Sequence, residues 1–185
     1  MPATEITFSP QRALEAILYI AARVNEPTIH EVLKLRYFAD KLHLSRYGWL
    51  ASGDDYVAMR FGPVGSGTYN LLKAARGDQS GWIHPAFADI ARAAIRIADD
   101  KKTIIRLRDA DAAVLSGADR ECLDEALRQY GNMPFGQRVE LSHDAAWAKA
   151  WRAATDDEVG QSPMPVLDIA ETLTNAADVI DHLRS

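Results

Sequence analysis

The chain has few of the features that would place it outside the cell or in a membrane. Its 185 residues include one cysteine, Cys122. An intramolecular disulfide therefore cannot form, and a reducing, cytoplasmic location is expected. No apolar run approaches the ~20 residues of a membrane-spanning helix, so we expect no membrane association. Residues 1–5 contain no basic region ahead of an apolar run, which predicts no secretory signal.

Positive charge is also scarce. The 21 Lys and Arg residues against 26 Asp and Glu give a formal net charge of −5. Non-specific nucleic-acid binding depends on neutralising phosphates, so nucleic acid is not an expected partner. The arginine pairs Arg92/Arg96 and Arg106/Arg108 are typical of solvated surface. A DNA-binding regulator of its own operon stays open as an alternative.

The remaining composition is that of an ordinary globular protein, with 48% hydrophobic and 25% charged residues. A chain of this length fits one domain that buries about 70% of its unfolded surface. We expect that domain over residues 1–155. A polar linker with two prolines follows over residues 156–165, and apolar residues at helical spacing predict an amphipathic helix over residues 166–185.

Apolar spacing predicts a mainly helical fold. Ser9 suits the N-cap of a first helix, with Pro10 at its first position. Thr28 and Glu31 have the spacing of a capping box at the start of a second helix, and Gly48 suits its end. Other helices are expected over the residues that lead to Gly77, and over residues 122–130, 134–141 and 144–154.

In two short regions apolar and polar residues alternate, which is the pattern of a β-strand. Residues 56–61 predict a half-buried strand. Residues 95–97 and 105–107 flank a turn-like segment, so we expect them to form a hairpin that joins the first strand. The predicted fold class is mainly α (α+β), a multi-helix globular domain with a small antiparallel β-sheet of about three strands.

The glycine-rich loop 62–67 lies between a predicted strand and a predicted helix. Gly62 and Gly67 have the spacing of the glycines in a phosphate-binding loop. Thr68, however, stands where that motif has its lysine, and no aspartate for magnesium follows an apolar strand. A nucleotide-binding switch or an enzyme that uses this loop is kept as an alternative.

Assembled catalytic and metal-binding motifs are missing from the sequence. None of the five histidines pairs with another at i+4, the spacing of a helical zinc site. Cys122 lies on the apolar stripe of its helix, which indicates a core residue rather than a nucleophile. The neighbours Ser142, His143 and Asp144 cannot form a triad, because adjacent side chains cannot point at one another in the required order. We expect no catalytic residue, no cofactor and no metal.

Amphipathic rings are dense in one stretch of the chain. They are Tyr37, His43, Tyr47, Trp49 and Tyr56. Tyrosine and tryptophan often dominate binding at protein interfaces, and this stretch holds more of these rings than one core needs. His143 and Trp147, near a predicted helix start, mark a second such place. These residues favour contact with a partner protein alongside packing in the core.

Short motifs recur in a distinctive order over about residues 10–155. They are Leu33-Lys34-Leu35, Tyr37-Phe38-Ala39-Asp40, His43-Leu44, Tyr47-Gly48, Gly53-Asp54, Tyr56-Val57-Ala58, Gly62-Pro63-Val64, Tyr69, Tyr130-Gly131 and Leu141-Ser142-His143 with Trp147. This ordered set resembles the SocA-like, or Panacea, antitoxin domain of bacterial and phage toxin–antitoxin systems. Relatives often have a proline soon after the Gly-Pro-Val motif, where this chain has residues 65–67, Gly-Ser-Gly.

The resemblance implies an antitoxin that holds a co-encoded protein toxin inactive by direct binding. It also implies a second role, as an adaptor that delivers the toxin to an AAA+ protease. Residues 156–185 fall outside the resemblance. The candidate partner-binding residues are Tyr37, Asp40, His43, Tyr47, Tyr56, Pro63, Tyr69, His143 and Trp147.

Overall fold

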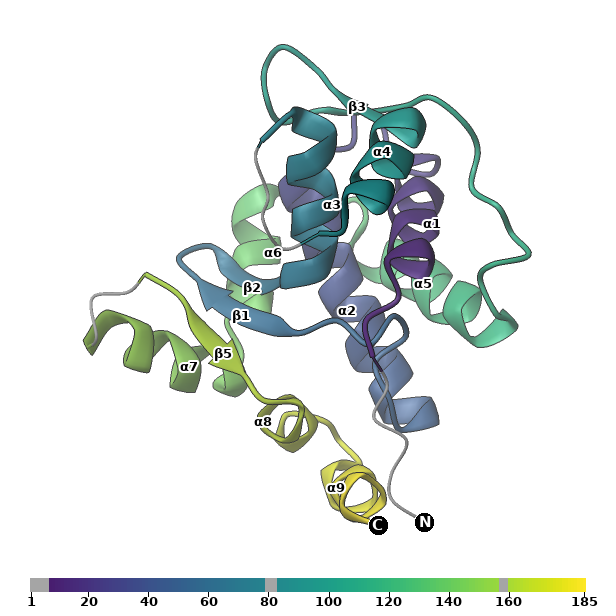
Figure 1. Ribbon diagram of the computed structural model, residues 1–185. Coiled ribbons are helices and arrows are strands. Elements are labelled where there is room, and N and C mark those ends of the chain that lie inside the picture. The colour runs from purple at the N-terminus through teal and green to yellow at the C-terminus, as the bar shows by residue number, and fades with distance from the viewer. Residues whose placement is uncertain (1–6, 79–82, 157–159) are drawn as a thin grey trace.

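The computed structural model describes residues 7–78, 83–156 and 160–185, which fold into a mainly helical protein with some β structure (Figure 1). The predicted fold class is confirmed. In these residues the helices are α1 (Pro10–Ala21), α2 (Ile29–Tyr47), α3 (Ser66–Arg76), α4 (Pro85–Ala94), α5 (Gly117–Tyr130), α6 (Phe135–Ser142), α7 (Ala145–Asp156), α8 (Val166–Glu171) and α9 (Ala176–Arg184). The strands are β1 (Tyr56–Met59), β2 (Gly62–Gly65), β3 (Ile95–Ile97), β4 (Ile104–Arg106) and β5 (Ser162–Met164).

Helix α2 is the centre of the molecule and packs against α1, α5, α6 and β2. Its first turn is capped by Thr28, whose Oγ1 accepts a hydrogen bond from the Glu31 amide at 3.2 Å. The other half of the predicted capping box is replaced by an ion pair, because the Glu31 carboxylate binds Arg138 of α6 at 2.6 Å. Gly48 ends the helix in the left-handed conformation at φ 84°, as predicted.

The main sheet is antiparallel with the strand order β2-β1-β5. In Figure 1 these strands lie side by side, with α7 next to β5. β1 pairs with β2 directly across the turn, and Ala58 lies opposite Pro63. Proline is tolerated there because β2 is an edge strand. The Gly-Pro pair therefore belongs to a strand instead of ending one.

The prediction that the hairpin of residues 95–107 joins this sheet is wrong. β3 and β4 pair with each other and form a separate two-stranded sheet, with Ile97 opposite Ile104. The third strand of the main sheet is β5, from the segment predicted as a linker, and Met164 lies opposite Tyr56. Residues 157–159 of that segment lie outside the described residues.

The predicted single helix over residues 166–185 is two helices, α8 and α9, and that prediction is wrong. Asn175 lies at the break, where its amide donates to the Ser45 carbonyl at 2.8 Å and its Oδ1 accepts from Ser45 Oγ at 2.8 Å. These bonds fasten the break to the last turns of α2. Both helices therefore pack against α2, while the domain boundaries at 155 and 165 stay a prediction.

Candidate functional site

Five of the nine predicted partner-binding residues lie inside the protein. They are Tyr37, Asp40, His43, Tyr56 and Pro63. Tyr37 and Asp40 are among the most deeply buried of the five, with relative exposures of 0%. Such side chains cannot contact a partner in this conformation. For these five residues we therefore propose a role in stabilising the fold and not direct contact with a partner.

Asp40 organises a buried network between α2 and the sheet. Its carboxylate accepts hydrogen bonds from the Tyr56 hydroxyl at 2.7 Å and from the Ala51 amide at 3.1 Å, and Arg36 lies 3.4 Å away. Arg36 also donates to Ser52 Oγ at 2.6 Å. Burial, followed by the charge of Asp40, raises the pKa of Tyr56 well above its usual value, so its hydroxyl stays a donor. Because the charges of Arg36 and Asp40 are paired, the cost of burying them is reduced.

His43, on α2, belongs to a second buried network, which is centred on Asp119 of α5. Asp119 accepts two hydrogen bonds from Arg12, both at 2.8 Å, and caps α5 by accepting from the Ser116 amide at 2.8 Å. His43 Nε2 lies 3.3 Å from Asp119, and its Nδ1 is 2.8 Å from the Trp49 carbonyl. Burial alone would raise the pKa of Asp119, but His43 and Arg12 hold it well below its usual range.

Tyr37 positions the start of α7. Its hydroxyl donates to Asp144 Oδ2 at 2.7 Å, and Lys41 donates to the same oxygen at 2.7 Å. The other oxygen of Asp144 caps α7 by accepting from the Trp147 amide at 3.0 Å. The buried Tyr37 therefore acts on the surface indirectly, by holding His143 and Trp147 in place.

The glycine-rich loop is already occupied by a carboxylate of this chain. Asp54 accepts hydrogen bonds from the Gly67 amide at 2.7 Å, the Thr68 amide at 2.9 Å and the Thr68 hydroxyl at 2.6 Å. Amides at a helix N-terminus are the groups that a phosphate would need. Gly65 also packs on Asp54, since a Cβ on Gly65 would lie 2.6 Å from Oδ2. This geometry does not support the nucleotide-binding alternative.

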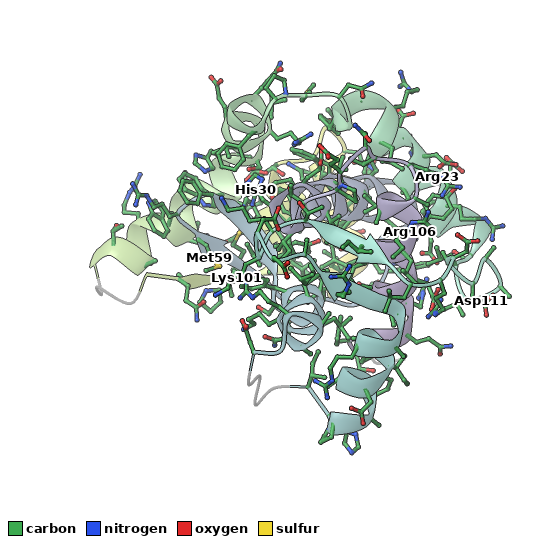
Figure 2. The ribbon with its side chains drawn as sticks, turned by 90° about the horizontal axis from the view of Figure 1, so that it is seen from above. Arg23, His30, Met59, Lys101, Arg106 and Asp111 are labelled. Carbon is green, nitrogen blue, oxygen red and sulfur yellow. The ribbon has the colours of Figure 1, made fainter. Side chains whose placement is uncertain are left out.

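Three stacked rings lie at the surface of α7. His143 stacks on Trp147 with 3.5 Å between the ring centroids and 2° between the planes, and Trp151 follows at 5.9 Å. The Trp147 indole donates to the Met59 carbonyl at 2.9 Å, which fastens α7 to the β1–β2 turn. Figure 2 shows Met59 on the side that carries α7, with Arg106 on the other side.

Two more rings lie on neighbouring elements, the β1–β2 turn and the start of α6. Phe61 and Phe135 are 50% and 51% exposed, and their centroids are 5.9 Å apart. Phe135 also contacts the ring of His30 at 4.2 Å. We call the five rings the aromatic ridge: Phe61, Phe135, His143, Trp147 and Trp151. The sequence pointed to His143 and Trp147 but not to the two phenylalanines. The one signal that could have indicated them is an aromatic side chain at a turn, for Phe61, and at a helix start, for Phe135.

The last two predicted residues lie elsewhere. The Tyr47 hydroxyl donates to Glu121 at 3.1 Å, at the far end of α2. Tyr69 lines a groove of about 580 Å³ on the outer side of the sheet, together with Phe8 and Lys73. Of the nine predicted residues, the structure therefore brings only His143 and Trp147 together at a partly exposed surface.

A family model described as antitoxin SocA-like, Panacea domain, matches residues 32–148. The chain belongs to this antitoxin-like family. The resemblance read from the ordered motifs is confirmed, and the match runs from α2 into α7. The SocA-like region includes Asp40, Asp119 and every ring of the aromatic ridge except Trp151. Searches of curated proteins and of solved structures each found no match.

Two further observations bear on chemistry and membranes. Over residues 7–78, 83–156 and 160–185, no group of three or more His, Cys, Asp or Glu side chains is placed to hold a metal ion. In the same part of this SocA-like chain, none of the helices combines the length and the apolar character needed to cross a membrane.

Proposed function

We propose that this chain is the antitoxin of a toxin–antitoxin pair and neutralises a co-encoded protein toxin by direct binding in the cytoplasm. Membership of the SocA-like family supports the antitoxin role. The observation that supports direct binding is the aromatic ridge, where Phe61 and Phe135 are half exposed beside the stacked rings of α7. Grouped exposed rings mark protein-binding surfaces, and rings held by stacking lose little entropy when a partner arrives.

The test is co-expression of the chain with the product of each adjacent open reading frame. We expect one neighbour to be toxic alone, to be harmless in the presence of this chain, and to co-elute with it in size-exclusion chromatography. If no neighbour is toxic or none is neutralised, the proposed function is wrong.

The ridge itself is tested by replacing Phe61 and Phe135 together with serine. Because both rings are half exposed, we expect the melting temperature to stay nearly unchanged, while affinity for the toxin falls by about 30-fold or more, the size of one interface hot spot. Binding is measured by calorimetry with the purified toxin. The matched control is Ile90→Ser on α4, which removes an apolar side chain of 47% exposure elsewhere. If the double variant and the control bind the toxin with equal affinity, the toxin binds at a surface other than the aromatic ridge.

We also propose that the chain acts as an adaptor that presents the bound toxin to an AAA+ protease. This role is supported by the family resemblance, and its measurable consequence is toxin turnover. In a pulse–chase experiment, we expect the toxin to be degraded faster when the chain is present and the protease intact. Rescue of growth with no change in toxin half-life after the protease gene is deleted would leave sequestration as the sole mechanism.

A further inference from the structure

Lys34 on α2 is a buried cation that has no counter-charge in the part of the chain that the structure describes. Its relative exposure is 1%, and its Nζ donates to the Pro63 carbonyl at 2.6 Å. Within the described residues no carboxylate lies within ion-pairing distance of it, whereas the buried Arg36 and Arg138 are each paired with an acid. Burial lowers the pKa of Lys34 to about 7. An unpaired buried ammonium destabilises a fold, so this lysine needs an explanation beyond packing.

Two histidines next to Lys34 also have unused hydrogen-bonding capacity. Among the described residues, both ring nitrogens of His30 and the Nε2 atom of His143 are buried without a hydrogen bond of normal geometry. Burial, and then the charge of Lys34, lower the pKa of both, that of His30 to about 4. Ser142 lies on the same side, since a Cβ on Gly62 would meet Ser142 Oγ at 2.4 Å and Lys34 Nζ at 2.9 Å. Basic and donor groups therefore converge beneath the β1–β2 turn.

The nearby acids are already engaged. Glu31 is held by Arg138 at 2.6 Å. Asp144, next to His143, accepts from the Tyr37 hydroxyl and from Lys41, each at 2.7 Å. Neither carboxylate compensates Lys34. Lys34 brings a positive charge that no described carboxylate balances, and each neutral imidazole can supply one further donor. The group that would complete the cluster is therefore an acceptor with negative charge.

We propose that Lys34, His30 and His143 form a receptor for a carboxylate of the toxin, an aspartate or glutamate side chain flanked by apolar residues. This inference rests on the proposed function and names the chemistry of the partner at the aromatic ridge. Phe135 covers His30 and touches Phe61, and both rings are half exposed. They can turn aside and pack on the apolar neighbours of the incoming acid. The carboxylate then accepts the hydrogen bonds that Lys34 and the histidines cannot make in the free chain.

The deciding variant is Lys34→Met, which keeps an unbranched side chain of similar size and removes its charge. We expect the melting temperature of the free chain to rise by about 4 °C or more, because an unpaired buried charge is lost. Affinity for the purified toxin is expected to fall by about 30-fold or more. A purely structural lysine would instead lose stability and would leave affinity for the toxin intact. Lys149→Met, on the exposed pair with Asp168, is the control and should change neither quantity.

A second measurement uses the wild-type chain. The Lys34 ammonium is titrated by ¹⁵N NMR in the free chain and in the complex with the toxin, and its pKa should rise by about 2 units or more on binding. A double-mutant cycle then pairs Lys34→Met with each Asp→Asn and Glu→Gln change in the toxin, and one acid should show strong coupling.

The outcomes separate this inference from the proposed function. If the wild-type chain binds the toxin and Lys34→Met binds it equally well, the carboxylate receptor is wrong and the antitoxin role stands. An unchanged Lys34 pKa in the complex overturns the receptor in the same way. If the wild-type chain neutralises no neighbouring gene product, the proposed function fails and the receptor fails with it.

Discussion

Replacing Asp40 with alanine is expected to lower the free energy of unfolding by about 3–5 kcal/mol, the usual effect of breaking a buried ion pair. The variant leaves the Arg36 guanidinium in the interior without its counter-charge. It also removes the acceptor of the Tyr56 hydroxyl and of the Ala51 amide. Because a domain has a total stability of about 5–15 kcal/mol, much of it would be lost. Urea denaturation followed by circular dichroism measures the change.

The control for Asp40 is Asp89→Ala. Asp89 also forms an ion pair with an arginine, Arg92, but its side chain is 75% exposed. Surface pairs contribute about 0–1 kcal/mol, so this variant should be nearly neutral. Similar losses in the two variants would mean that burial of the Asp40 network has no special effect on stability.

Asp119→Ala is expected to lower the free energy of unfolding by about 3 kcal/mol at neutral pH, with a loss that shrinks in acid. The wild-type carboxylate binds Arg12 and caps α5 through Ser116. Its pKa lies below the usual value of 3.8, because His43 and Arg12 outweigh the effect of burial. A group with a lowered folded-state pKa stabilises the fold above its unfolded-state pKa. That stability is lost as the pH falls through the folded-state value.

The measurement for Asp119 is denaturation of wild type and variant at neutral pH and near pH 3. The two curves should approach each other at the lower pH, since Asp119 is already partly protonated in the unfolded wild-type chain there, while its lowered pKa keeps it ionised in the folded chain. A difference that stays constant across this range would assign the role of Asp119 to helix capping and packing without a contribution from charge. Glu121→Gln is the control on the same helix and should be nearly neutral at both values, because the side chain of Glu121 is 58% exposed.

Local signals in the sequence predicted the helices well. Ser9 and Thr28 cap α1 and α2 through the amides three residues later, and Gly48 and Gly77 end helices in the left-handed conformation. These features depend on a few neighbouring residues, so they can be predicted from the sequence. The capping box at the start of α5, formed by Ser116 and Asp119, has the same local character and was not predicted.

The sheet could not be predicted in the same way. β1 pairs with residues that follow at once and with residues about a hundred positions later, and both partner strands contain a proline. Alternation pointed instead to residues 95–107, which form a sheet of their own. Strand pairing over such separations depends on which elements pack together, and a short alternating pattern does not carry that information.

The residues of the candidate site were also only partly predictable from the sequence. The density of Tyr, Trp and His over residues 37–56 suggested contacts with a partner, but Tyr37, His43 and Tyr56 pack inside. Their own partners, Asp144, Asp119 and Asp40, come mostly from distant parts of the chain. An amphipathic ring suits an interface and a satisfied interior equally well, so composition alone cannot choose between them.

The sequence by itself determined the mainly helical class, most helix ends and membership of the SocA-like family, because caps, apolar spacing and ordered motifs are properties of the chain. The tertiary structure alone decided which polar residues are buried, how α8 and α9 separate at Asn175, and where the aromatic ridge forms. It also showed that the buried Lys34 has no counter-charge among the described residues, although it donates to the Pro63 carbonyl. The physical reason is distance along the chain: burial and charge pairing depend on residues far apart in sequence, which only the packed fold brings together.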